Sequence, residues 1–300
     1  MSMSSTQTKA DLSVWQIESL RITCFPGSAT EFNSGNWWQD VIGEQPENTL
    51  VRARDGFRQD EGNFNQRKVV LGVQPVRIDW LMKSNEEEGE LTIGSFQDGL
   101  DSFFELMSRW FKISPPLRRL AFGTILALPV DDRKSGYELI ANYLPNVKLD
   151  PIGSSDFLYQ INRTRNSRLG ISELEINRLS KWSVAKRGLV RFALSPDAHV
   201  SSFPSSETFS CRLELDINTS GEYKNDIPSG KLVDVFHELV DLAKEIAVKG
   251  DIPSWPSITP PLNIIFFHLR IRVLPLDSII RWLRISLKMF NLCHSINFKI

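Results

Sequence analysis

Cysteine and histidine are scarce in this 300-residue chain, which contains three cysteines and four histidines. Cys24, Cys211 and Cys293 lie far apart in the sequence and form no C-x-x-C pair. This spacing predicts neither a disulfide framework nor a cysteine-ligated zinc site. The histidines form no H-E-x-x-H pair, which is a usual signature of zinc-dependent hydrolases. We therefore expect no metal ion and no other cofactor.

Long apolar runs are also missing. The chain has no uninterrupted apolar stretch of about 18 residues, so we expect no transmembrane segment. The N-terminal sequence MSMSSTQTKADLS lacks the apolar segment that a signal peptide needs. Together with the few cysteines, these absences indicate a protein of the reducing cytoplasm.

Common catalytic motifs are absent as well. The sequence contains neither G-x-G-x-x-G nor G-x-x-x-x-G-K-[ST], the glycine-rich loops that bind phosphates at a helix N-terminus. Ser229-Gly230-Lys231 lacks the upstream glycine of such a loop and is expected to start a helix. No G-x-S-x-G presents a serine nucleophile. Cys24 and Cys211 stand at apolar strand positions, where buried inert thiols are expected. The sequence favours a protein that is not an enzyme.

The residues that are present indicate an ordinary globular domain, with 41% hydrophobic and 24% charged residues. Runs of apolar or alternating residues predict strands over 14–25, 50–53, 68–82, 120–130, 157–163, 172–179, 189–194 and 211–218. Pro75, inside the third of these runs, favours an edge position or a bulge. In the last run, alternate residues starting at Cys211 would face inward, and Arg212, Glu214, Asp216 and Asn218 outward.

Apolar residues at helical spacing predict helices over 96–111 and 230–249, with shorter helices at Trp37 and over 137–143. Strands mostly follow strands, without alternating with helices. The predicted fold is therefore α+β, an antiparallel or mixed β-sheet with helices packed on it in a single domain.

The two ends of the chain differ from this domain. Residues 1–12 are small and polar and are expected to form a disordered leader, so that the domain spans 13–255. Residues 256–300 are apolar and basic, with Asp277 as their single acidic residue. Within them, 276–292 can form a basic amphipathic helix that covers the domain, binds a partner or lies on a membrane surface. The same composition would also arise from a sequence accident such as translation past a frame change.

A basic stretch is the first candidate binding site. If residues 163–191 form a hairpin, several of its basic side chains share a face and could follow the phosphates of a nucleic acid. Trp182 could stack on a base, although a core position is the alternative. A solvated basic face is the other explanation of the stretch. The residues concerned are Arg163, Arg165, Arg168, Arg178, Lys181, Lys186, Arg187 and Arg191.

A metal-dependent nuclease or hydrolase is the alternative function. Asp216 and Glu222 could bind a divalent metal, and Lys224 could position the attacking water. The intervening Asn-Thr-Ser-Gly sequence is typical of a turn, which argues against this site. His237 with Asp234 and Asp241 could also share one helix face, although a solvated, charge-paired helix face is the favoured explanation of these three residues.

Three segments resemble a sporadically distributed family of uncharacterised bacterial proteins. Arg119–Ile125, followed by 139–144, resembles the family's R-hydrophobic-G strand and short helix. The sequence L-E-L-D-I-N at 213–218 is similar to its L-D-I-D strand, and 232–246, with His237 and Ala243, is similar to its closing helix. The resemblance covers residues 13–250. It implies an α+β domain of unknown activity in a bacterial cytoplasm and supplies no catalytic residues.

From the sequence we therefore expect a non-enzymatic binding or interaction protein. Its partner would be a protein or a nucleic acid, and the basic stretch would be the contact surface.

Overall fold

The computed structural model describes residues 11–29, 36–84, 91–194 and 200–251. Nine strands form one antiparallel sheet with four helices packed on it, which confirms the predicted α+β single domain. The strands are β1 (Gln16–Pro26), β2 (Asn48–Arg52), β3 (Phe57–Phe64), β4 (Arg67–Gln74), β5 (Arg77–Lys83), β6 (Leu117–Val130), β7 (Leu158–Asn166), β8 (Glu175–Leu194) and β9 (Val200–Thr219). The helices are α1 (Trp37–Ile42), α2 (Leu100–Trp110), α3 (Arg133–Tyr143) and α4 (Leu232–Lys249), and short 3-10 turns lie at η1 (Leu12–Val14), η2 (Ala53–Asp55) and η4 (Ser229–Lys231).

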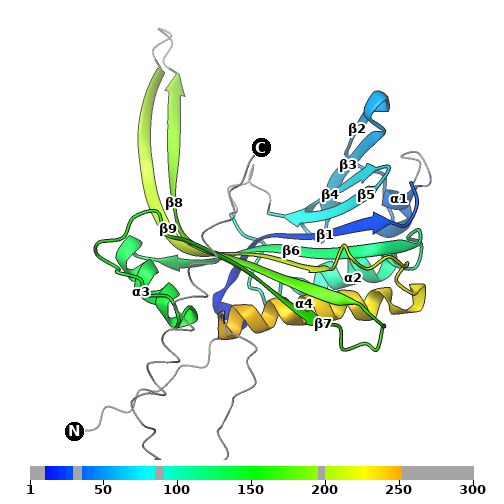
Figure 1. Ribbon diagram of the computed structural model, residues 1–300. Coiled ribbons are helices and arrows are strands. Elements are labelled where there is room, and N and C mark those ends of the chain that lie inside the picture. The colour runs from blue at the N-terminus through cyan, green and yellow to red at the C-terminus, as the bar shows by residue number, and fades with distance from the viewer. Residues whose placement is uncertain (1–10, 30–35, 85–90, 195–199, 252–300) are drawn as a thin grey trace, which may run out of the picture. The chain divides into compact units, whose positions relative to one another are not determined.

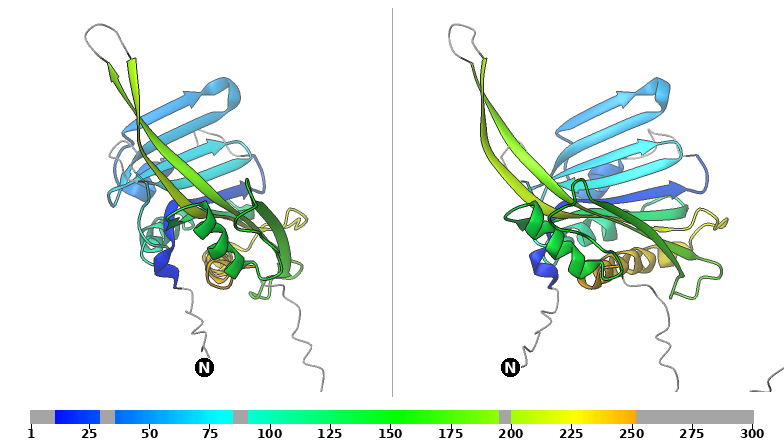
Figure 2. Two further views of the ribbon diagram at one scale, coloured as in Figure 1. Left: turned by 90° about the vertical axis from the view of Figure 1, so that its left-hand side faces the viewer. Right: turned by 60° about the vertical axis from the view of Figure 1, so that its left-hand side comes forward.

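The strands lie in the order β2-β3-β4-β5-β1-β6-β9-β8-β7, so β1 and β6 are near the centre of the sheet. Strands β8 and β9 are each 20 residues long and pair along their whole length. They continue past the last residues that β6 and β7 pair with, and they leave the sheet as a two-stranded ribbon. Figures 1 and 2 show this ribbon on one side of the central strands and strands β2 to β5 on the other side. Both rise away from the face of the sheet that α2 and α4 cover.

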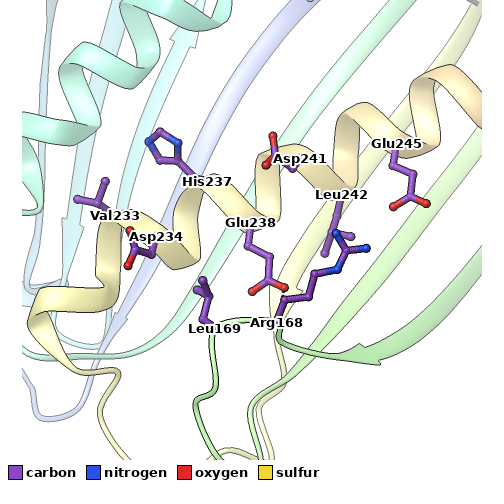
Figure 3. A pocket seen from close by; sticks show the side chains of 9 residues that line it. All are labelled: Arg168, Leu169, Val233, Asp234, His237, Glu238, Asp241, Leu242 and Glu245. Atoms are coloured by element: carbon purple, nitrogen blue, oxygen red, sulfur yellow. Dashed lines mark hydrogen bonds between the residues drawn. The ribbon is translucent and has the colours of Figure 1, made fainter.

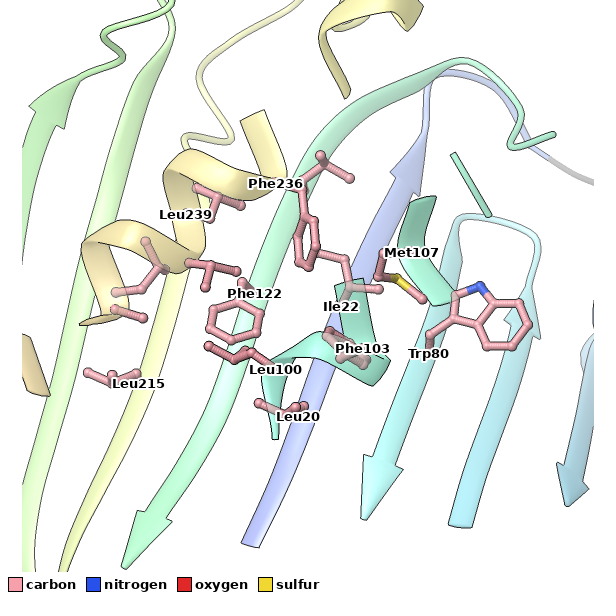
Figure 4. Close-up of a cluster of buried hydrophobic side chains, with 14 of the residues drawn as sticks. Leu20, Ile22, Trp80, Leu100, Phe103, Met107, Phe122, Leu215, Phe236 and Leu239 are labelled. Atoms are coloured by element: carbon pink, nitrogen blue, oxygen red, sulfur yellow. The ribbon is translucent and has the colours of Figure 1, made fainter. Parts of the chain in front are cut away.

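The hydrophobic core lies between the sheet and helices α2 and α4 (Figure 4). Apolar residues recur at helical spacing in both helices, so each turns one apolar face to the sheet. The Phe103 ring of α2 lies 6.4 Å from the Phe122 ring of β6 and 6.0 Å from the Phe236 ring of α4. Further along the sheet, Trp80 of β5 lies 5.8 Å from Trp110 of α2. The aromatic stripe of the predicted helix over 96–111 is therefore core.

The alternation predicted over 211–218 is confirmed. Cys211, Leu213, Leu215 and Ile217 are buried on the helix side of β9. Arg212, Glu214 and Asp216 point to the opposite face, as the register with β6 requires. The helix predicted over 230–249 is observed as α4. No helix in the described part of the chain is both long and apolar enough to cross a bilayer. The predicted amphipathic helix over 276–292 lies outside the described residues.

Three strand predictions differ from the structure. Pro75 is in the turn between β4 and β5, where no ladder donor is needed, and both strands are interior rather than edge strands. Strand β3 was not expected, because Phe57–Phe64 has no apolar alternation and is held by pairing on both sides. The strands predicted over 172–179 and 189–194 are one continuous strand, β8. Its polar middle is held by pairing with β9.

Both described cysteines are expected to resist alkylation in the folded protein. Burial raises the pKa of the Cys24 thiol to about 12, and burial raises that of Cys211 to about 12 as well. Because the thiolate is the reactive species, iodoacetamide should modify both residues in urea but neither in native buffer at mildly alkaline pH. Peptide mass spectrometry of the labelled protein measures each cysteine separately. Rapid native labelling of Cys24 would contradict this expectation.

Candidate functional site

The face of the sheet opposite α2 and α4 is built from rows of side chains set by strand register. Directly opposed residues of antiparallel strands point to the same face. In one row Arg21 on β1 is opposite Gly123 on β6, and Gly123 is opposite Asp216 on β9. The neighbouring row, from β5 to β8, consists of Lys83, Ser19, Ile125, Glu214 and Lys181. Register therefore gathers charged side chains from distant parts of the sequence.

Two adjoining hollows lie over these rows. The first has a volume of about 420 Å³ and is lined by residues of β5, β1, β6, β9, β8 and β7. The second has a volume of about 450 Å³ and shares Ser19, Leu81 and Ile125 with the first. We call the two together the sheet groove. Each volume falls within the range of about 300–1,000 Å³ that is typical of small-molecule sites.

Two carboxylates of the sheet groove are held in ion pairs. Glu18, whose side chain is 9% exposed, lies 2.5 Å from Arg187 Nη2 and 3.6 Å from Arg212 Nη2. The Glu214 carboxylate accepts from Lys181 Nζ at 3.1 Å and lies 3.6 Å from Arg212 Nε. These contacts join β1, β8 and β9 across the groove. Three of its five cations therefore already have carboxylate partners.

Arg21 and Lys83 are the other two cations. Arg21 Nε is buried, and it has no hydrogen-bond partner among the described residues. Its side chain lies over Gly123, where an added Cβ would be 3.3 Å from Arg21 Nη2 and 3.4 Å from Nε. Glycine therefore lets the guanidinium approach the backbone of β6 closely. Asp216, on the far side of Gly123, accepts a hydrogen bond from Asn218 Nδ2 at 2.9 Å.

The structure distributes the predicted basic stretch over both faces of the sheet. On the helix face, Arg163 donates from Nε to Asp251 Oδ1 at 2.5 Å and from Nη2 to Oδ2 at 2.8 Å. Arg165 Nη1 lies 3.6 Å from Glu245 Oε2 of α4. Arg178 is 7% exposed on the same face, and burial lowers the pKa of its guanidinium. These three arginines are part of the packing between β7, β8 and α4.

The remaining basic residues lie elsewhere. Lys181 and Arg187 belong to the sheet groove, with the carboxylate partners given above. Lys186 Nζ lies 2.7 Å from Glu207 on the neighbouring strand β9. The backbone of Arg191 is opposite that of Phe203 in the β8–β9 ribbon, and Arg168 lies in the connection between β7 and β8. The predicted hairpin of β7 and β8 is present, but it does not bring the basic side chains between Arg163 and Arg187 onto one face.

The residues of the predicted nuclease site are also separated. Asp216 lies in the sheet groove on β9, whereas Glu222 and Lys224 lie in the loop between β9 and η4. Both loop side chains are exposed, at 92% and 74%, and their charged groups are 3.8 Å apart. Within the described residues, no group of three or more His, Cys, Asp or Glu side chains is arranged to hold a metal ion.

A third hollow, of about 380 Å³, lies between α4 and the β7–β8 connection (Figure 3). Its acidic side chains have structural contacts. Glu238 is buried and accepts from Ser167 Oγ at 2.6 Å and from the Arg168 backbone N–H at 2.7 Å. Asp234 pairs with Lys231 at 3.1 Å. His237 stacks on the ring of Phe104 at 4.7 Å and lies beside Asp234 and Asp241 on the helix surface. The two hydrogen bonds of Glu238 hold the connection against α4.

Sequence reasoning did not identify Arg21, Gly123 and Lys83 as site residues. The one local signal was a glycine inside an otherwise apolar strand, which often marks a close approach to the backbone. Comparison with known proteins adds no residue: no protein-family model matches the sequence, and no curated protein is significantly similar to it.

Proposed function

We propose that this chain is a non-enzymatic binding protein of the bacterial cytoplasm that binds its ligand in the sheet groove. The observation that carries this proposal is the buried Nε of Arg21 without a hydrogen-bond partner in the described part of the protein. Buried donors in folded proteins are nearly always satisfied, and an unsatisfied one costs about 1–3 kcal/mol. A ligand that accepts from Arg21 would remove that cost.

The lining of the groove supports the same proposal. Ligand sites combine apolar walls with a few polar groups that orient the ligand. Leu81, Ile125 and Leu179 supply apolar surface, and Arg21 and Lys83 supply cations without ion pairs among the described residues. The bacterial location rests on the resemblance of three segments and on the few cysteines.

Nucleic-acid binding and metal-dependent hydrolysis have less support from the described contacts. A surface that follows phosphates needs unpaired cations in a row. Arg163, Arg165 and Lys186 instead have carboxylate partners. For hydrolysis, Glu222 and Lys224 are on an exposed loop, whereas Asp216 is in the sheet groove. A protein partner on the groove stays an alternative occupant.

Two glycine variants test whether the groove binds ligands. Gly123→Leu places a side chain in the groove beneath Arg21, and Gly72→Leu is the matched control. Gly72 is on β4, on the same face of the sheet as Gly123 but outside the groove lining. An added Cβ there would be 3.9 Å from Asp79 Cβ. We expect Gly123→Leu to weaken binding of a naphthyl probe by at least about tenfold and Gly72→Leu to leave it unchanged.

The probes are 1-naphthoate, 1-naphthyl phosphate and the neutral 1-naphthamide, each titrated by fluorescence and calorimetry. If Gly123→Leu abolishes binding of at least one probe and Gly72→Leu does not, the result supports the groove as the binding site. If no probe binds the unmodified protein, or if both variants bind all three equally well, the proposed function is wrong.

A further inference from the structure

We infer that the ligand of the sheet groove is a small molecule with a carboxylate or phosphate group and an apolar body. Its oxyanion would bind at the oxyanion corner, which we define as Ser19, Arg21 and Lys83. This inference rests on the proposed function of the groove as a binding site.

Strand register places the three side chains of the oxyanion corner together. Ser19 of β1 is directly opposite Lys83 of β5, and such pairs have Cβ atoms about 4.5–5.5 Å apart. Arg21 is two residues further along β1, so it points to the same face, roughly 7 Å away. Ser19 lines both hollows, whereas Arg21 lines the first and Lys83 the second. The Ser19 hydroxyl is thus flanked by one residue with an ammonium and one with a guanidinium. Charge-assisted donors of this kind bind carboxylates and phosphates strongly.

Among the charged groove side chains that have no ion pair within the described residues, the sign differs from one side of the groove to the other. Arg21 and Lys83 lie on β1 and β5, without ion pairs among the described residues, whereas Asp216 lies on β9. An oxyanion is attracted to the first side and repelled by the carboxylate on the other. Leu179 on β8 is directly opposite Asp216, and Ile125 is on the groove floor. The ligand would therefore place its oxyanion toward β5 and its apolar body toward β8.

A compact oxyanion fits the groove better than a polyanion such as a nucleic acid. The other cations of the groove, Lys181, Arg187 and Arg212, already have carboxylate partners at Glu214 or Glu18. A second phosphate along the groove would therefore find no unpaired cation. The available donors suit one anionic group of a molecule small enough for hollows of about 420 and 450 Å³.

The test compares the three naphthyl probes in the full-length protein and in three variants. Arg21→Gln keeps hydrogen-bonding capacity but removes the charge. Arg54→Gln is the matched control, since Arg54 is exposed in η2, outside the groove lining. We expect Arg21→Gln to weaken the binding of 1-naphthoate or 1-naphthyl phosphate by about tenfold to a hundredfold. The affinity for 1-naphthamide should change by less than about threefold. Asp216→Asn, which removes the repelling carboxylate, should tighten the anionic probes.

The neutral probe distinguishes lost recognition from lost structure. Equal weakening of the amide and the anions by Arg21→Gln would overturn the inference, and so would unchanged binding of both anions. The proposed function would survive that second result if Gly123→Leu still abolished binding. The anion that binds more tightly identifies carboxylate or phosphate as the natural group.

Discussion

Phe236→Ala is expected to lower the free energy of unfolding by about 3–5 kcal/mol. Phe236 is 1% exposed, and its ring lies 6.0 Å from that of Phe103 and 5.4 Å from that of Phe104, both on α2. It also lies 6.1 Å from the ring of Phe122 on β6. One side chain thus joins α4, α2 and the sheet. The surrounding aromatic rings are fixed on two other elements, α2 and β6, so they relax only partly into the cavity.

Urea unfolding followed by circular dichroism measures this effect. The control is Val233→Ala on the same helix, because Val233 is 37% exposed and its truncation should change stability by less than about 1 kcal/mol. A similar midpoint shift for both variants would show that Phe236 does not have the central role in packing that its contacts indicate.

The parts of the fold that the sequence predicted well are those with a clear apolar period. In α4, Val235, Leu239 and Ala243 recur at helical spacing, and in β9 alternate residues from Cys211 are apolar. Such a pattern predicts a helix or a strand from the local sequence, because the spacing of the buried residues differs between the two. Strand β3 has no such pattern. Asp60 is buried there and accepts hydrogen bonds from Arg58 of the same strand and Thr49 of β2, so these side-chain contacts compensate for missing apolar residues.

The candidate site could not be predicted in the same way. Arg21, Gly123 and Asp216 are far apart in sequence, and they become neighbours only through the register of β1, β6 and β9. The basic stretch gave the opposite result. Alternation along β7 and β8 places its residues on two faces, and two of them have carboxylate partners, Asp251 beyond the end of α4 and Glu245 within α4. A run of charges in sequence is therefore a weak predictor of a charged surface when the run is a hairpin within a sheet.

Asp251→Asn is expected to destabilise the protein by about 3 kcal/mol at neutral pH. The Asp251 side chain is 7% exposed and accepts from Arg163 at 2.5 and 2.8 Å and from the Tyr159 hydroxyl at 2.7 Å. Replacing the carboxylate with an amide removes a negative charge beside Arg163 and the buried Arg178. The control is Asp226→Asn, since Asp226 is 47% exposed and 4.0 Å from Arg118, a pair expected to contribute less than about 1 kcal/mol.

The effect of Asp251→Asn should also depend on pH. Burial raises the pKa of Asp251, but the hydrogen bonds from Arg163 and Tyr159 outweigh it and hold the pKa below the ordinary value of 3.8. A carboxyl whose pKa is lower in the folded than in the unfolded state stabilises the protein fully at pH values above the unfolded-state pKa. This stabilisation is lost as the pH falls through the folded-state pKa. Urea midpoints of the unmodified protein and the variant should therefore converge below about pH 4. A constant difference from neutral to strongly acidic pH would show that the change acts through packing and not through the carboxylate charge.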